Sequence, residues 1–167
     1  NGDGGFENGS TMASNNWTVA AGVATNQWFV GNTAVPATGT NSAYISSNGF
    51  GGTYDYNTSS PSTVYFYKDI FFPVGKPRIT ISFKYKVVGE SFFDRGFICY
   101  TDPANTPVTN DVFSSSAPSY ATSVSGNFNT WGNTNGVYVT SPYLLPSNFV
   151  VTTRRIIIAW QNDGNGS

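Results

Sequence analysis

Apolar and polar residues alternate along one clear stretch of the chain, "ITISFKYKV", which covers residues 79–87. Apolar side chains occupy every second position from Ile79 to Val87, and threonine, serine or lysine occupies each position between them. Successive side chains of a strand point to opposite faces, so this period of two predicts a half-buried antiparallel strand. We expect Lys84 and Lys86 on the polar face of that strand.

Short strand patterns recur along the rest of the chain, whereas no stretch combines a helical apolar period with helix start signals. The other predicted strands are "NQWFVG", "SAYISS", "VYFYKDIFF", "GFICYT", "GVYVTS" and "RRIIIAW". Loops rich in glycine, proline and asparagine separate them, as is typical of an all-β sandwich or barrel. Because these loops are long, we predict a jelly-roll β-sandwich of antiparallel strands. With no repeat and no linker, residues 1–167 are expected to form a single domain.

Composition indicates a folded chain without an obvious charged partner. Charged residues make up 10% of the sequence and aromatic residues 16%, whereas disordered chains favour high charge and few aromatics. The net charge is −1 and the only basic pair is Arg154-Arg155, so neither nucleic acid nor an anionic membrane is expected as a partner. No apolar stretch has the length of a membrane span. The single cysteine, Cys99, excludes an intrachain disulfide and is expected to be a buried, inert thiol.

The commonest general base and the motifs of several enzyme classes are missing from the sequence. There is no histidine, and no nucleophile elbow, Walker loop or dinucleotide fingerprint is present. Glu90 and Asp94 in "GESFFDRG" are the one candidate pair of catalytic carboxylates. They are equally suited to pairing with Lys86 and Arg95, or to capping the turn. We therefore expect a protein that is not an enzyme.

Aromatic residues in polar loops favour ligand binding, because a flat ring stacks on a sugar face while neighbouring amides and carboxylates bind its hydroxyls. Four aromatic residues are candidate ligand contacts: Tyr54, Tyr56, Tyr120 and Trp131. The alternative is that they close the ends of the sandwich. Three tryptophans lie within apolar strand patterns and are expected in the core: Trp17, Trp28 and Trp160.

Six segments follow one another in an order that resembles a known family: "GFENGSTMASNNWTVA", "NQWFVGNTAV", "GTNSAYISSNGF", "VYFYKDIFFPVG", "ITISFKYKVVGES" and "RRIIIAWQNDGNG". Together they resemble the cleaved-adhesin (MAM-like jelly-roll) domains of secreted Bacteroidetes surface proteins, which accompany gliding-motility adhesins and other type IX secretion cargo. The resemblance implies an extracellular, cell-surface domain that binds glycans or proteins without catalysis. A carbohydrate-binding module of a secreted hydrolase and a structural spacer are the alternatives.

The opening segment "NGDGGFENG" is rich in glycine and in oxygen-bearing side chains, so it either follows a tight path around an ion or is a frayed terminus. Related jelly-roll modules hold a structural calcium ion near the N-terminal strand. The resemblance implies that Glu7 is a calcium ligand. Because calcium takes oxygen ligands, Asp3 and Asn41 are candidates to complete its shell, together with backbone carbonyls. The alternative is a glycine-rich segment in which Glu7 is solvated.

The sequence departs from the family pattern after "NDGNG". In the family this turn is followed by a closing strand of the type "IDNI", whose aspartate often completes the metal site, whereas here the sequence stops at Ser167. We expect either a fragment of a longer chain or a partner that supplies the closing strand. An open sheet edge favours strand complementation by a partner or by a secretion-system component.

Overall fold

The computed structural model describes residues 5–20, 22–49, 54–74, 79–90, 93–108, 121–123, 138–149 and 151–165. These residues form nine strands and two single-turn 3-10 helices, η1 (Ala13–Asn15) and η2 (Ser147–Phe149). None of the helices in these ranges is long and apolar enough to cross a membrane. The fold is all-β, as the sequence predicted.

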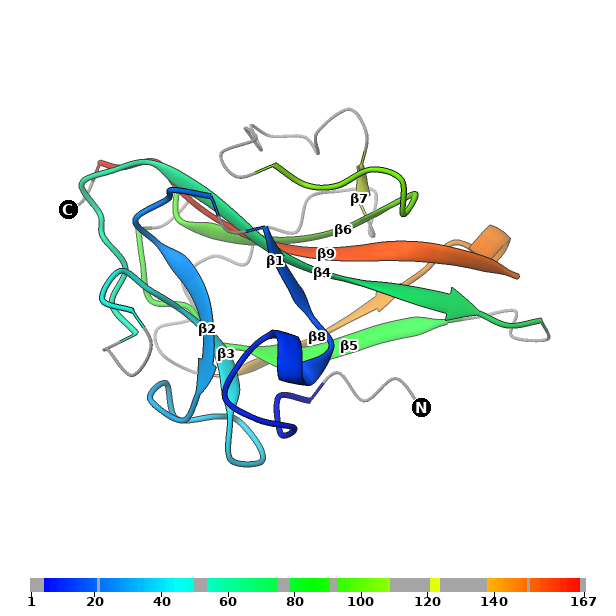
Figure 1. The fold of residues 1–167 in the computed structure, drawn as a ribbon, viewed down its shortest axis with the longest axis horizontal. Helices are drawn as coiled ribbons and strands as arrows, with labels where there is room; N and C mark the ends of the chain where they lie inside the picture. Colours follow the sequence, from blue (N-terminus) through cyan, green and yellow to red (C-terminus); the bar gives the residue numbers. More distant parts are fainter. Residues whose placement is uncertain are drawn as a thin grey trace.

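The larger layer is a five-stranded antiparallel sheet with the order β1-β4-β9-β6-β7 (Figure 1). Its strands are β1 (Thr18–Ala20), β4 (Ser62–Phe72), β9 (Thr152–Asn162), β6 (Arg95–Thr101) and β7 (Thr122–Ser123). The central pair, β4 and β9, is matched along eleven residues of each strand, from Ser62 opposite Asn162 to Phe72 opposite Thr152. The register of this central pair therefore determines where the other strands of the sheet are placed.

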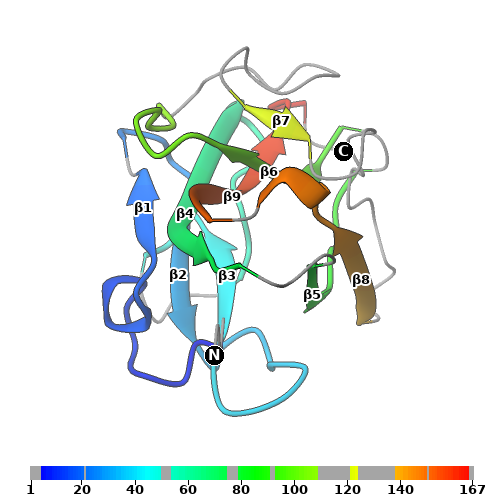
Figure 2. The ribbon, with the colours of Figure 1, turned by 90° about the vertical axis from the view of Figure 1, so that its right-hand side faces the viewer.

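The second layer consists of two antiparallel strand pairs on the same side of that sheet (Figure 2). One pair is β2 (Gln27–Gly31) with β3 (Ser42–Ser46), and the other is β5 (Thr80–Tyr85) with β8 (Val139–Leu144). An apolar core lies between the layers. In it Val64, Ile98 and Trp160 of the large sheet share one cluster with Ile81 and Tyr143 of the smaller layer.

Three of the strand pairs are nested in the sequence, which gives the sandwich its jelly-roll winding. β6 pairs with β7, β5 pairs with β8 outside them, and β4 pairs with β9 outside both. Successive pairs alternate between the two layers, so the chain is wound like a long hairpin folded over itself.

The large sheet is buried on both faces. Along β9, Ile156 and Trp160 belong to the core between the layers, whereas Ile157 and Ala159 belong to a second cluster on the opposite face, together with Cys99. A sheet covered on both faces needs apolar residues at every position, which explains the continuous run in "RRIIIAW". By contrast, β5 alternates between exposed and half-buried residues, as its period of two predicted.

Most predicted strands are confirmed, with shifted ends. β8 begins at Val139 and reaches Leu144, later than the predicted "GVYVTS", and the sequence did not predict the short strands β1 and β7. Trp17 and Trp160 are buried as expected, and Trp28 is half-buried, with its indole N–H donating to the Val64 carbonyl at 3.1 Å.

The N-terminal segment packs on the sandwich from Gly5 onward. The Phe6 ring is stacked on Trp17 at 6.3 Å between centroids and meets Phe66 edge-on at 6.1 Å. Met12 joins the same cluster beside β2. These contacts anchor the segment that carries Glu7, so the described part of the segment is not a frayed end.

Candidate functional site

A lysine lies between two tyrosine rings near one end of the β5–β8 pair. The Lys86 ammonium is 5.7 Å from the centroid of the Tyr54 ring and 5.1 Å from that of Tyr138. Both distances fall within the range of a cation–π interaction. Lys86 directly follows β5 and Tyr138 directly precedes β8, so the pairing of Tyr85 with Val139 brings them together. We call Tyr54, Lys86 and Tyr138 the tyrosine–lysine cluster.

The segment that carries Tyr54 is held by hydrogen bonds on its C-terminal side. The backbone N–H of Ser47 donates to the Asp55 carbonyl at 3.1 Å. Two residues further on, the Asn57 N–H donates to the side-chain oxygen of Asn26 at 2.6 Å, and the amide of Asn26 donates back to the Asn57 carbonyl at 2.9 Å. Asn26 is fully buried, so water competes little for these hydrogen bonds. Tyr54 is therefore attached to a rigid support while half of its surface remains exposed (51%).

A strained turn completes the surroundings of the cluster. The Val35 N–H donates to the Asn32 carbonyl at 3.2 Å, and Val35 has a φ of +48°, a conformation that is costly for a β-branched residue. The Tyr138 hydroxyl donates to the Val35 carbonyl, and the Lys86 ammonium donates to the Ala34 carbonyl at 3.4 Å. Burial raises the pKa of Tyr138, because it disfavours the phenolate, so its hydroxyl remains a donor at neutral pH.

Lys86 has no acidic partner in the described part of the chain. The ion pairs there join Arg154 to Asp102 and Arg155 to Asp69. The cluster thus presents an exposed aromatic ring beside an unneutralised cation. Such a surface can stack on an apolar ring face and attract a negative group on the same ligand.

Tyr56, although only two residues from Tyr54, points into the sandwich. Its ring meets Trp160 edge-on at 5.4 Å between centroids, and its hydroxyl donates to Asp94 Oδ2. Burial, followed by this hydrogen bond, raises the pKa of Tyr56. Its hydroxyl is therefore already engaged within the protein. Tyr120 and Trp131, the other two predicted ligand contacts, lie outside the described residues.

Glu90 and Asp94 are joined by hydrogen bonds across one turn, which the Asp94 carboxylate caps. The Asp94 N–H donates to the Glu90 carbonyl at 3.1 Å, and the Glu90 N–H donates to Asp94 Oδ2 at 3.0 Å. Asp94 is buried, with 4% of its surface exposed. Of the alternatives that the sequence left open for this pair, the structure shows the turn cap.

Glu7 is bound by backbone N–H groups of a distant loop. Thr40 donates to its two carboxylate oxygens at 3.1 and 3.0 Å, and Asn41 donates to Oε1 at 3.0 Å. Gly39 has a φ of +75°, and a Cβ placed there would lie 2.8 Å from Cδ of Glu7. Only glycine therefore combines this backbone conformation with this approach of the carboxylate.

Backbone N–H groups face the Glu7 carboxylate at the predicted calcium site. Two of the three predicted ligands, Glu7 and Asn41, are brought together, whereas Asp3 lies outside the described residues. Residues 40 and 41 face the carboxylate with N–H donors, and an ion needs oxygen atoms there. No group of three acidic, histidine or cysteine side chains gathers anywhere in the described ranges. Calcium binding at Glu7 therefore stays a prediction, and in this conformation backbone N–H groups bind the carboxylate.

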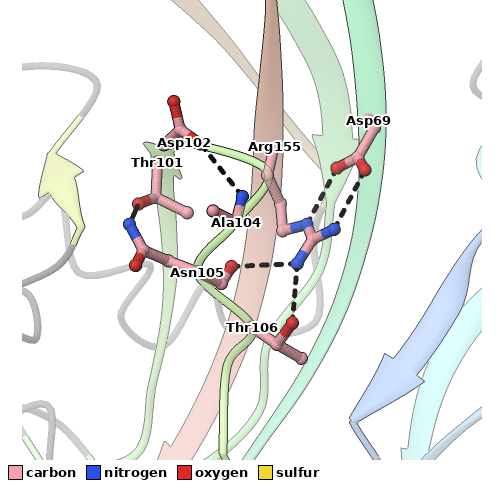
Figure 3. Close-up of polar contacts among 7 residues, drawn as sticks. All are labelled: Asp69, Thr101, Asp102, Ala104, Asn105, Thr106 and Arg155. Carbon is pink, nitrogen blue, oxygen red and sulfur yellow. Dashed lines mark hydrogen bonds and ion pairs between the residues drawn. The ribbon is translucent and has the colours of Figure 1, made fainter.

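Arg155, on β9, holds a loop against the large sheet (Figure 3). Its Nε and Nη2 donate to the two Asp69 oxygens at 2.8 and 2.9 Å, and Nη1 donates to the Asn105 carbonyl and to Thr106 Oγ1 at 2.9 and 3.0 Å. The hydrogen bond to Asp69 raises the pKa of Arg155, and the guanidinium lies 4.3 Å from the centroid of the Tyr67 ring. With these partners Arg155 is a structural clamp.

Sequence reasoning missed two of the three residues of the tyrosine–lysine cluster. Lys86 was predicted on the polar face of the strand over residues 79–87, whereas it directly follows β5, and its predicted position gave no sign of neighbouring rings. Tyr138 was hidden in a predicted strand. The signal that would have found both is the pairing of β5 with β8, which a local pattern does not contain.

No match to this chain is found among protein-family models, curated proteins or solved structures. The resemblance to cleaved-adhesin domains therefore stays a prediction. Function has to be inferred from the geometry of the cluster.

Proposed function

We propose that this chain is a non-catalytic, extracellular adhesin-type domain that binds glycans through the tyrosine–lysine cluster. The observation that carries the proposal is the exposed Tyr54 ring beside the Lys86 ammonium, which has no acidic partner among the described residues. Location at a bacterial cell surface and export as type IX secretion cargo rest on the sequence resemblance alone.

Carbohydrate recognition fits the chemistry of this surface. The apolar face of a pyranose packs on an aromatic ring, and its hydroxyls bind nearby polar groups. The hydrogen bonds at Asp55 and Asn57 hold the Tyr54 segment before any ligand arrives. Less conformational freedom is then lost on binding, which favours affinity for a small ligand.

A glycan array comparing the wild-type protein with Tyr54→Ala tests the proposal. Phe71→Ala is the matched control, because Phe71 is similarly exposed (59% against 51% for Tyr54) and lies near the C-terminal end of β4. We expect the wild type and Phe71→Ala to bind the same glycans, and Tyr54→Ala to lose them. Equal binding by all three proteins, or no binding by any of them, would refute the proposal. The second result would favour a structural spacer.

A further inference from the structure

We propose that the tyrosine–lysine cluster selects glycans that carry a carboxylate, such as those built from uronic acids. The inference deepens the proposed function and rests on it. It names the class of sugar that the geometry around Lys86 fits best.

The Lys86 ammonium has few partners among the described residues. Its ammonium has three N–H donors, and within the described part of the chain the Ala34 carbonyl, at 3.4 Å, accepts one of them. Its other close neighbours are the faces of two rings, which attract a cation without neutralising it. Arg154 and Arg155, by contrast, each have an aspartate partner. As far as the described residues go, Lys86 therefore offers a ligand a positive charge and further N–H donors.

The charge of Lys86 lies close to the exposed Tyr54 ring. The ammonium lies over one face of the Tyr54 ring, 5.7 Å from its centroid, so a monosaccharide that contacts the exposed part of this tyrosine is close enough for a group at its edge to approach Lys86. A neutral sugar offers only hydroxyls to the ammonium. A uronic acid offers a carboxylate, and an N–H donated from a cation to a carboxylate is about twice as strong as a neutral hydrogen bond. The combination therefore discriminates between acidic and neutral sugars.

Hydrogen bonds to a neighbouring turn hold the tyrosine–lysine cluster in place. Carbonyls of the Asn32–Val35 turn accept hydrogen bonds from Lys86 and Tyr138, which limits the movement of both side chains. The turn keeps Val35 at a positive φ although 67% of its surface is exposed, so burial of the side chain does not offset the strain. Strain of this kind is concentrated at ligand clamps and active sites. The turn presents the ammonium in one place, as selective recognition requires.

The experiment measures the affinity of the protein for oligogalacturonate and for its methyl ester, which has the same sugar rings without the charge. We expect the wild type to prefer the acid by about tenfold and this preference to weaken as salt is added. Lys86→Gln should bind both forms equally, while Lys86→Arg should keep most of the preference. Lys84→Gln is the matched control, because it removes the same charge from an exposed position two residues away and should leave the preference intact.

Three outcomes would overturn the inference: no preference in the wild type, an equal loss in Lys84→Gln and Lys86→Gln, or tighter binding of an acidic peptide such as poly-glutamate than of the uronate. If the wild type binds neutral glycans through Tyr54 without preferring the acid, only the carboxylate selectivity fails. If neither form nor any array glycan binds, the proposed function fails as well. Thermal unfolding of each lysine variant establishes that the fold is retained.

Discussion

Replacing Gly39 by alanine should release the Glu7 carboxylate from the loop that holds it. A Cβ at residue 39 would lie 2.8 Å from Cδ of Glu7, so the carboxylate has to move away from the N–H groups of Thr40 and Asn41. Gly49 provides a matched control. Its φ of +84° is close to the +75° of Gly39, but no atom lies within 4 Å of the position of its Cβ.

Comparing the two glycine variants separates the cost of placing alanine in this backbone conformation from the loss of the contact with Glu7. Alanine in the left-handed region costs about 1 kcal/mol, and this is all that Gly49→Ala should lose. Gly39→Ala should lose the same amount and also the hydrogen bonds to the carboxylate. These contribute about 1.5 kcal/mol, the low end for a charged acceptor, since Glu7 is exposed. We therefore expect a loss of about 2.5 kcal/mol for Gly39→Ala.

The decisive assay is a double-mutant cycle followed by urea unfolding. Glu7→Ala alone should cost about 1.5 kcal/mol, because it removes the same hydrogen bonds. In the Glu7→Ala background Gly39→Ala should cost only its backbone term of about 1 kcal/mol. The coupling between Gly39 and Glu7 is then about 1.5 kcal/mol, well above the roughly 0.3–0.5 kcal/mol scatter of independent sites.

Additive effects of Gly39→Ala and Glu7→Ala would refute the contact between the carboxylate and the loop. A Gly49→Ala variant as unstable as Gly39→Ala would show that the backbone term alone explains the loss. Thermal midpoints should follow the same order, because about 1 kcal/mol shifts the midpoint of a protein of this size by roughly 2–4 °C.

Three further predictions concern the thiol, the arginine clamp and calcium. Burial raises the pKa of Cys99 to about 12 from 9.0, so the folded state keeps a proton that the unfolded state releases. The stability that the protonated Cys99 thiol contributes is fully present below pH 9. It is lost as the pH rises toward 12, by up to about 1.4 kcal/mol per pH unit. Urea unfolding at pH 9 and 10 should show this loss in the wild type and a smaller one in Cys99→Ala; parallel profiles would contradict it. Asp69→Asn leaves the buried Arg155 without its bidentate partner and should cost about 2 kcal/mol in urea unfolding, whereas Asp102→Asn, at an exposed pair, should cost less than about 0.5 kcal/mol; equal losses would count against the clamp. If calcium binds through Glu7, calcium at a hundredfold excess over its Kd should stabilise the wild type by about 2.7 kcal/mol relative to EDTA. Glu7→Gln should abolish this gain, and an unchanged wild-type midpoint would dismiss the site for this chain.

The fold was predictable where burial leaves a periodic signature. Residues 79–87 alternate because one face of β5 is solvated. β4 and β9 do not alternate, because both faces of the large sheet are buried, yet their length and apolar content still marked them as strands. β1 and β7 escaped prediction, since strands of three and two residues are too short to show any period.

The candidate site was predictable only in part, because it is made by long-range pairing. Tyr54 and Tyr56 share one loop and similar neighbours in sequence, but only the folded chain reveals that one is exposed and the other donates to Asp94. The ring of Tyr138 reaches Lys86 through the β5–β8 register. No local pattern in the sequence records such a contact.

The nested order of the strand pairs has a consequence for how fast and in which order the chain folds. Ser62 and Asn162, which join the ends of β4 and β9, are 100 positions apart in the sequence. Closing so long a loop first is entropically unfavourable, whereas β6–β7 and then β5–β8 close shorter loops and bring the outer strands together. The pathway of least entropic cost therefore runs from the middle of the sequence outward, at the slow rates of proteins rich in distant contacts. During synthesis β4 has no partner on its β9 side until that last described strand is complete, so the large sheet can assemble only after nearly the whole of this chain has been made.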